Sequence, residues 1–442
     1  MSAAVPPSHR TTIHWVSPLP PLQTDIAHYT RRILPALASK ADVVLWTSQT
    51  AWSADVERYA SVRRFDPLAR RPMDFSQTPS VRNQINAIFF NIGNSWVFHK
   101  DIYLLSRRIP GVTVLHDFVL QEFFRDLVAN KAISPADYIG LMNRYYGADA
   151  ATAAQAICAT GRLDPETFTR FPMFEAAIDN AVAVLTHTHA GAREVAGRRL
   201  TPSYRLDLPF EARPKFSHER AESGPLRLVQ FGHIGPNRRL VQIIEALASV
   251  AADVDFQFEI LGAVWNHALI ERTIAAYGLK EKVRIRGFVE EAALDAAIAG
   301  AHLVFNLRHP TMGEASGSQL RIWDHASLSV VTRIGWYDEL PDDCVLKISL
   351  EDERAEIADL VRSLAQDRVR YRLVSQAGRR RLEERHNPDL YAEGVMDVVC
   401  RFRQDVRDRL VLDATTSALR RIQPEGALLS KTAALQMLQT ST

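Results

Sequence analysis

Residues 301–329 of the chain read AHLVFNLRHPTMGEASGSQLRIWDHASLS, and this stretch decides the fold class. The apolar run 303–307 is typical of a fully buried strand, Pro310 and Gly313 interrupt it, and 319–326 has the spacing of a helix. A buried strand that leads through a small-residue loop into a helix is the repeating unit of a parallel α/β sheet. Ligands of such sheets bind at the carboxyl ends of the strands, where this loop is expected.

The loop itself carries residues suited to a ligand with both phosphate and hydroxyl groups. A helix that begins near Ser316, Gly317 and Ser318 directs free backbone N–H groups at an anion. Glu314 stands beside that point, and its carboxylate can accept hydrogen bonds from sugar hydroxyls. A nucleotide sugar fits this combination. An ordinary helix start, with Ser316 as the cap and Glu314 near the positive end of the dipole, explains the same residues, and both interpretations stay open at this point.

The whole composition is that of a soluble protein with two domains. The chain has 442 residues, of which 47% are hydrophobic and 24% charged. Lys and Arg number 53 against 51 for Asp and Glu, so a net charge of +2 gives no electrostatic reason to expect a nucleic-acid partner. Three widely spaced cysteines, Cys158, Cys344 and Cys400, argue against a disulfide framework and against a zinc site.

The sequence predicts a cytoplasmic protein. Its start lacks a basic segment followed by an apolar one, and no later apolar run approaches the ~18 residues of a spanning helix. The basic spots at 198–199 and 379–381 are compatible with peripheral contact at the inner face of a membrane, although such runs are usually solvated helix faces. No oligomeric state is predicted.

Alternating strand and helix patterns divide the chain into three parts. The first predicted parallel-sheet domain spans 1–210, the segment 209–225 is rich in Pro, Gly and charge and is the expected linker, and the second domain spans 225–386. Residues 387–442 are expected to form a long helix and a tail. The predicted strands of the two domains are 12–17, 41–46, 85–90, 112–115 and 181–185, and then 226–231, 256–261, 283–286, 303–307, 329–332 and 345–348.

Polar residues follow two strands of the first domain. Asn94 and Ser95 come after the strand at 85–90, and His116 and Asp117 come after the strand at 112–115. This edge suits chemistry, so we interpret His116 as a group near the reacting centre and Asn94, Ser95 and Asp117 as acceptor-side residues. A core histidine at 116 and ordinary turn formers at the other positions are the alternatives. His99 on the next helix is either a further acceptor-side residue or an ordinary helix-face histidine. The tract 186–189, THTH, lacks a carboxylate partner, so no metal site is predicted.

The first loop of the second domain, 231–239, reads FGHIGPNRR. Its glycines allow a ligand to approach the backbone, and Arg238 can bind diphosphate oxygens. An arginine after a strand is more often a solvated helix start, but the second phosphate-suited feature at 313–318 strengthens the functional interpretation.

At these residues the chain resembles the retaining glycosyltransferases of family 4. Those enzymes have the GT-B fold, in which two Rossmann-like domains face each other and a C-terminal helix returns to the first domain. The sequence 231–247, FGHIGPNRRLVQIIEAL, resembles the family's G-R-L-x-x-x-K-G diphosphate loop. The resemblance implies that Gly232 starts this loop and that Arg238 takes the place of the lysine on the donor diphosphate.

The resemblance extends to the rest of the donor site. Phe288 and Val289 would lie against the nucleobase, and Glu314 corresponds to the first glutamate of the family's E-x7-E signature, which contacts the donor sugar. The turn 316–318 would hold phosphate through its N–H groups. His116 matches the first-domain histidine near the reacting sugar.

Three positions depart from the family pattern. The usual arginine of the diphosphate loop is His233 here, and the second glutamate of the signature falls on Ile322. Asp324 lies about 200° around the helix from the lost glutamate and cannot substitute for it. A glycine-rich loop normally follows the first strand, yet Thr24 and Asp25 stand there.

The sequence therefore predicts a retaining hexosyltransferase that uses a nucleotide-sugar donor and a glycan or lipid-linked acceptor, in surface polysaccharide or glycoconjugate synthesis. No metal or other cofactor is expected. A glycan-binding pseudoenzyme and a sugar-nucleotide epimerase on a similar fold are the alternatives. The final helix should bury Leu390, Val395, Val398 and Val399 against the first domain.

Overall fold

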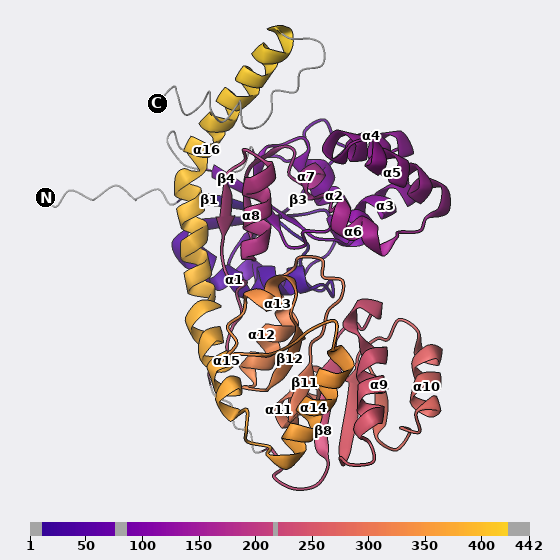
Figure 1. Cartoon of the computed structure of the whole chain (residues 1–442). Helices are drawn as coiled ribbons and strands as arrows, with labels where there is room; N and C mark the ends of the chain where they lie inside the picture. The colour runs from indigo at the N-terminus through magenta and orange to yellow at the C-terminus, as the bar shows by residue number, and fades with distance from the viewer. Residues whose placement is uncertain (1–10, 76–85, 215–219, 423–442) are drawn as a thin grey trace, which may run out of the picture.

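The computed structural model describes residues 11–75, 86–214 and 220–422 of the chain. Two parallel sheets lie one above the other, and a long helix, α16 (Pro388–Ile422), runs along the first domain (Figure 1). The first sheet contains β1 (Thr12–Val16), β2 (Asp42–Thr47), β3 (Ser61–Arg64), β4 (Asn86–Ile92), β5 (Gly111–Leu115), β6 (Ala181–Thr186) and β7 (Ser203–Arg205). Its spatial order is β3-β2-β1-β4-β5-β6-β7.

The strands of this sheet alternate between two cores because successive side chains point to opposite faces. Ile13 and Trp15 of β1 pack under α1 (Asp25–Lys40) and α16 (Pro388–Ile422). Val16 joins the other core, which is covered by α2 and by a group of helices inserted between β5 and β6. These helices are α2 (Trp96–Ser106), α3 (Gln121–Ala129), α4 (Pro135–Tyr146), α5 (Ala148–Thr160), α6 (Pro165–Arg170) and α7 (Phe174–Ala177), and α8 (His189–Arg198) follows β6.

The second sheet has the order β10-β9-β8-β11-β12-β13. Its strands are β8 (Leu226–Phe231), β9 (Phe256–Leu261), β10 (Val283–Gly287), β11 (Leu303–Phe305), β12 (Ser329–Thr332) and β13 (Leu346–Ile348). The order reverses between β8 and β11, and such a reversal is the point where open α/β sheets bind ligands. The helices of this domain are α9 (Leu240–Val250), α10 (His267–Ala276), α11 (Glu291–Gly300), α12 (Gly317–Asp324), α13 (Gly335–Glu339), α14 (Glu353–Gln366) and α15 (Arg372–Arg385). Short 3-10 turns lie at Ala54–Arg58, in the first domain, and at Pro236–Arg238, in the second.

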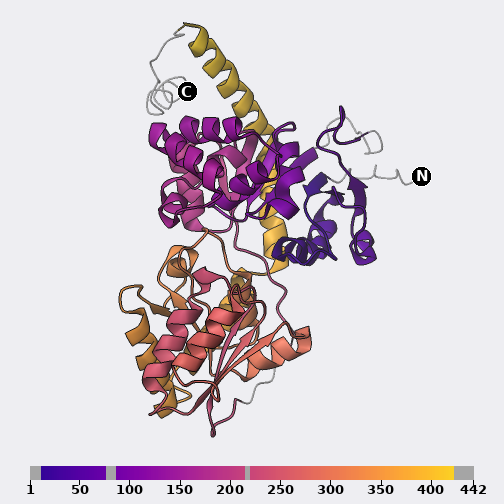
Figure 2. The ribbon, with the colours of Figure 1, turned by 90° about the vertical axis from the view of Figure 1, so that its right-hand side faces the viewer.

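The chain crosses between the two sheets twice, and the crossings are hydrogen-bonded to each other. The N–H of Phe210 donates to the carbonyl of His386 at 2.6 Å, and the His386 ring bonds the Leu208 carbonyl at 2.7 Å. The second crossing leads directly into α16, which returns to the first domain (Figure 2). The two crossing segments are therefore tied to each other.

Helix α16 is fixed to the first domain along much of its length. Its buried face includes Tyr391, Val395, Val398 and Val399 and packs with α1, but Leu390 is 49% exposed, so its predicted burial was wrong. The helix register explains the difference, because Tyr391 takes the inward position, where its hydroxyl bonds that of Tyr29.

Two further contacts of α16 hold it in place. The Tyr204 hydroxyl donates to Asp405 at 2.8 Å, and Arg409 donates to the carbonyl of Ala181 at 2.9 Å. Both partners lie in the first domain.

Candidate functional site

The loop from β11 to α12 is organised by Asn306, which sequence reasoning did not single out. Its side-chain oxygen accepts from Arg238 at 3.1 Å, and its N–H2 group donates to Gln319 at 3.0 Å. Ser316 caps α12 by accepting from the N–H of Gln319 at 3.1 Å. Asn306 therefore connects the predicted diphosphate loop with the predicted phosphate-binding helix start.

The start of α12 keeps unused backbone donors. Ser316 satisfies only the third N–H of the helix, and within the described ranges the N–H groups of Gly317 and Ser318 have no acceptor. Both residues are half-buried, while Ser316 is buried. Two adjacent free donors at the positive end of a helix form a site for an anion.

Arg238 is buried among neutral acceptors. It is 2% exposed, and its guanidinium donates to the Phe231 carbonyl at 2.9 Å and to Asn306, while Nε has no partner in the described part of the chain. Burial, followed by the nearby charge of Arg308, lowers the pKa of Arg238 to about 9. A buried cation without a carboxylate is costly, and an anionic ligand would compensate it.

Arg308 is a second cation of the site that sequence reasoning missed. Its guanidinium pairs with Glu314 at 3.1 Å, and its N–H donates to Thr332 at 3.0 Å. The motifs that carry the family resemblance do not include this position, and only the fold brings Arg308 beside Arg238. Arg308 thus supplies positive charge in a site whose diphosphate loop carries His233 instead of arginine.

Glu314 is held mainly by its own loop. Besides Arg308, its carboxylate accepts from the Thr311 hydroxyl at 3.1 Å and from the N–H of Met312 at 2.8 Å. A carboxylate has about four acceptor positions, so one remains for a ligand hydroxyl. Glu314 both shapes the loop and retains one free acceptor position.

The first domain contacts this loop directly. The N–H groups of Phe118 and Val119 donate to the Met312 carbonyl at 2.8 and 2.9 Å. Gly313 has φ +76° and lies so close to Phe118 that a Cβ there would meet the Phe118 Cβ at 2.4 Å. Only glycine combines this backbone conformation with this approach.

A second contact between the domains involves a helix start. Both oxygens of Glu339, on α13, accept from the first N–H groups of α8, at 2.8 Å from His189 and 2.6 Å from Ala190. A carboxylate at this position stabilises the helix dipole. The two domains are therefore joined by contacts at two places around the site that contains Arg238, Arg308 and Glu314, which is called the cleft below.

Asp117 faces the same cleft. It accepts from the N–H of Asn94 at 2.7 Å, and burial, then the charge of Glu314, raises its pKa to about 7. Asn94 itself bonds Glu122 and the N–H of Phe123, so it braces the start of α3. Ser95 is half-buried at the start of α2 and makes no side-chain cap bond.

His116 is a neutral, half-buried histidine. Asn91 donates to the Val16 carbonyl and therefore presents its oxygen to His116 Nε2 at 3.0 Å, which places the His116 proton on Nε2. The ring packs edge-on to Tyr29 and beside His187, and burial, then His187, lowers its pKa well below the usual value. Nδ1 keeps a lone pair that can accept from a hydroxyl.

Of the other predicted residues, Gly232 lies beside Arg238, because a Cβ there would be 3.4 Å from the Arg238 guanidinium. His99 is 1% exposed and bonds the Asn91 carbonyl, so its possible acceptor-side role is replaced by a core role. His233 is exposed, Phe288 is 81% exposed and Val289 is half-buried. Gly232, at φ +99°, backs directly onto Gly262.

Ile322, at the position of the second glutamate of the family signature, and the nearby Asp324 both have structural roles. Ile322 is fully buried against Val229 and Val304, and Asp324 is paired with Arg213 and Arg379. Arg379 is thus buried, and the predicted basic spot at 379–381 is not a solvated face throughout.

Two negative findings concern the described residues alone. No helix among them is long and apolar enough to cross a membrane, and no group of three or more potential ligands there could hold a metal ion. His187, in the histidine tract, instead bonds the Leu206 carbonyl at 3.0 Å.

Comparisons with known proteins bear on the fold. No protein-family model matches the chain, and no curated protein matches it. Among solved structures, Anabaena HepE in complex with UDP and glucose is 12% identical, with 91% of this chain and 99% of HepE covered and a TM-score of 0.55. Sucrose-phosphate synthase from Thermosynechococcus elongatus is 14% identical (89% and 99% covered, TM-score 0.56), and WaaG, a glycosyltransferase involved in lipopolysaccharide biosynthesis, is 13% identical (87% and 98%, TM-score 0.53). The predicted fold is confirmed: the chain has the GT-B architecture of two facing Rossmann-like domains that these proteins share.

Proposed function

We propose that this protein is a retaining glycosyltransferase that moves a hexose from a nucleotide-sugar donor to a glycan or lipid-linked saccharide. The observation that carries the proposal is Arg238, a buried guanidinium with neutral partners beside two unused helix N–H groups. A diphosphate would pair with the guanidinium and also accept from the two N–H groups. The similar structure of HepE was determined with UDP and glucose, which supports a nucleotide-sugar donor here.

Charge developed on the leaving diphosphate would be stabilised by this chain's own groups. Arg238 and the N–H groups of Gly317 and Ser318 would take the phosphate oxygens, and Arg308 would add a second positive charge. These fixed donors act without a metal ion. Glu314 would use its remaining acceptor position to orient a sugar hydroxyl.

The first domain would hold the acceptor and the reacting face of the sugar. His116 is neutral, so its Nδ1 would accept from a hydroxyl of the donor sugar. Asp117, with a pKa of about 7, would accept a hydrogen bond or the proton from the attacking acceptor hydroxyl. Attack on the same face as the departing diphosphate gives retention, and most of the rate enhancement would come from placement and electrostatics.

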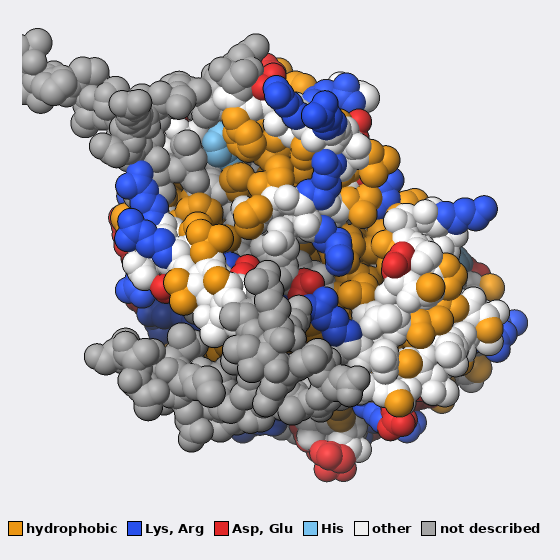
Figure 3. Space-filling view, turned by 90° about the horizontal axis from the view of Figure 1, so that it is seen from above, with side chains coloured by type: hydrophobic (Ala, Val, Ile, Leu, Met, Phe, Trp, Pro, Cys, Tyr) orange, Lys and Arg blue, Asp and Glu red, His pale blue; other side chains and the backbone are white. Residues whose placement is uncertain are grey.

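A lipid-linked acceptor would require the protein to approach a membrane surface. The face of the first domain turned away from the second shows hydrophobic side chains bordered by Lys and Arg (Figure 3). In the loop after β3, Leu68 is 81% exposed beside the exposed Arg70 and Arg71, and Arg108 fixes the loop through the carbonyls of Pro67 and Ala69. Such a combination of apolar and basic groups suits peripheral contact with anionic lipid.

Two observations favour a second function, that of a glycan-binding pseudoenzyme. Ile322 leaves the site without the family's second glutamate, and Phe288, expected at the nucleobase, is open to solvent. An epimerase would need two carboxylates around a free pocket, and Asp117 with Glu314 is the pair available for it.

The deciding experiment measures nucleoside diphosphate release from UDP-, GDP- and dTDP-linked hexoses, with and without saccharide acceptors. Acceptor-dependent release with the α or β configuration preserved supports the proposal. Binding of glycan without release from any donor supports the pseudoenzyme, and interconversion of free sugar nucleotides supports the epimerase. The same donors can be ranked beforehand by thermal shift, since a ligand at 100 times its Kd stabilises by about 2.7 kcal/mol.

A further inference from the structure

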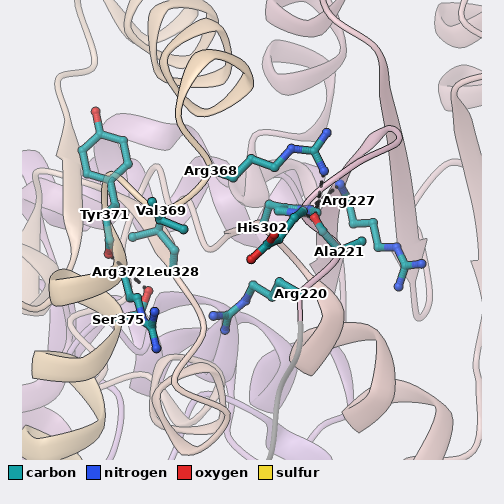
Figure 4. Close-up of a pocket in the computed structure, with 11 residues that line it drawn as sticks. Arg220, Ala221, Arg227, His302, Leu328, Arg368, Val369, Tyr371, Arg372 and Ser375 are labelled. Carbon is teal, nitrogen blue, oxygen red and sulfur yellow. Dashed lines mark hydrogen bonds between the residues drawn. The ribbon is translucent and has the colours of Figure 1, made fainter.

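A basic pocket lies at the opposite edge of the second sheet from the cleft. It has a volume of about 620 Å³ and is lined by residues that precede or begin the strands β8, β11 and β12 and by the turn between α14 and α15. Figure 4 shows Arg220, Arg227, Arg368 and Arg372 around His302. A smaller hollow of about 340 Å³ shares Arg220 and Arg372 with it.

The arginines of this pocket have neutral partners. Arg220 donates to the carbonyls of Ala301 and Ala326, at 2.8 and 2.7 Å, and Arg368 donates to the carbonyls of Ala221 and Gly224. In the described part of the chain, none of the four arginines forms an ion pair. The charges of Arg220 and Arg368 are therefore hydrogen-bonded to neutral groups, and no carboxylate pairs with any of the four arginines in the described residues.

Two other arginines of this domain do have a carboxylate partner. Arg239 pairs with Glu353 at 2.6 Å, and Arg379 pairs with Asp324 at 2.6 Å. Arg238 lacks a carboxylate too, but it belongs to the cleft. This cluster of four arginines thus lacks the ion pairs seen elsewhere in the same domain, and an anion from outside the protein would compensate its charge.

The remaining lining adds no further positive charge to the pocket. His302 accepts from the N–H of Arg227 through Nδ1 at 2.9 Å and contacts the Ala221 carbonyl through Nε2 at 2.9 Å, so it is neutral. Burial, then the charges of Arg368, Arg220 and Arg227, lowers its pKa. The single carboxylate among the described lining residues is Glu222, which is exposed.

We propose that this pocket is a binding site for a phosphate-bearing ligand, held by Arg220, Arg368 and Arg372. Guanidinium groups bind phosphate through paired N–H donors, and three of them from two segments can surround one phosphate group. The ligand would be a phosphorylated small molecule or the headgroup of an anionic lipid. Because Arg220 and Ala221 belong to the connection between the domains, its occupancy would fix that connection to α14 and α15.

The test is a titration of the full chain with inorganic phosphate, followed by 31P NMR at constant ionic strength. It uses four variants besides the parent: Arg372→Gln in the pocket, Arg354→Gln as a control, Glu222→Gln and Arg238→Gln. Arg354 is an exposed arginine on α14 that pairs with Glu245, so this control removes the same charge at another place. Arg372 is exposed as well, so its loss should leave the fold intact.

We expect saturable binding that weakens at least tenfold in Arg372→Gln, is unchanged in Arg354→Gln and tightens in Glu222→Gln. Binding should survive in Arg238→Gln, because that variant affects only the cleft. Equal weakening in Arg354→Gln, loss confined to Arg238→Gln, or no saturable binding would overturn the proposal. Sedimentation with phosphatidic acid vesicles, compared with phosphatidylcholine, separates the ligand sources: sedimentation that Arg372→Gln abolishes indicates a headgroup, and phosphate binding without sedimentation indicates a soluble ligand.

Discussion

Arg238→Gln should weaken nucleotide binding without lowering stability. Burial lowers the pKa of Arg238 from the usual arginine value to about 9. At 1.36 kcal/mol per unit, the folded protein therefore carries a penalty on the order of 5 kcal/mol for the buried charge. The substitution removes this penalty but loses two hydrogen bonds, which contribute about 1 to 1.5 kcal/mol each. We expect the free energy of unfolding to be equal to or above that of the parent.

The same variant should bind free UDP or another nucleoside diphosphate more weakly. A lost charge-assisted hydrogen bond costs about 1.5 to 3 kcal/mol, which corresponds to a roughly 10- to 150-fold higher Kd. The Kd of the donor should rise by a similar factor, because both ligands carry the diphosphate. Calorimetry measures the Kd, and urea unfolding measures stability.

The adjacent Arg239 provides a matched control with the opposite expected result. It has φ +60° and binds Glu353, which is 3% exposed, through two nitrogens. Arg239→Gln leaves that carboxylate buried and unpaired, and we expect a loss of roughly 2 to 4 kcal/mol of stability with nucleotide affinity unchanged. If Arg238→Gln instead lost stability and kept its affinity, the assignment of Arg238 to the diphosphate site would be refuted.

Four other perturbations follow from the same geometry. Glu314→Gln should keep diphosphate affinity within a few-fold but lose transfer by about tenfold to a thousandfold in kcat, and near-normal kcat would remove Glu314 from the sugar site. Asp117 has a raised pKa, so the folded state holds its proton more tightly than the unfolded state does, and stability falls as pH rises from about 4 to about 7. Asp117→Asn should therefore raise Tm at pH 8 but not at pH 3. The increase in transfer rate of the parent as pH rises through about 7 should be absent in this variant. Ending the chain at residue 386 should abolish transfer and destabilise the first domain, whereas Glu339→Gln should only make the nucleotide-free protein less compact in small-angle scattering; full activity of the truncated chain would show that α16 is dispensable.

The parallel sheets were predictable because buried strands leave apolar runs in the sequence. The run at 303–307 marks β11, and the capped helix start at Ser316 marks α12, which begins two residues before the predicted 319. Here the cap decides the boundary, since Gly317 and Ser318 carry no apolar signal. The burial of Leu390 was predicted wrongly because neighbouring helix positions differ in exposure and only the packing on α1 selects Tyr391.

The site was predictable only where a residue follows a strand end. Glu314, Arg238 and Asp117 were predicted in this way, and the fold brings them close enough for the charge of Glu314 to act on the pKa of the other two. Asn306 and Arg308 were missed because their role depends on partners from other elements: Asn306 bonds Arg238 and Gln319, which lie 68 and 13 positions away from it. The pairing of Arg239 with Glu353 spans 114 positions and leaves no local pattern.

The most direct test of the central claim is a crystal structure of the full chain with the nucleoside diphosphate that gives the largest thermal shift. We predict that the diphosphate lies in the cleft, with oxygens within hydrogen-bond distance of Arg238 Nε and of the Gly317 and Ser318 N–H groups. A diphosphate bound elsewhere, with Arg238 Nε still without a partner, would contradict the account.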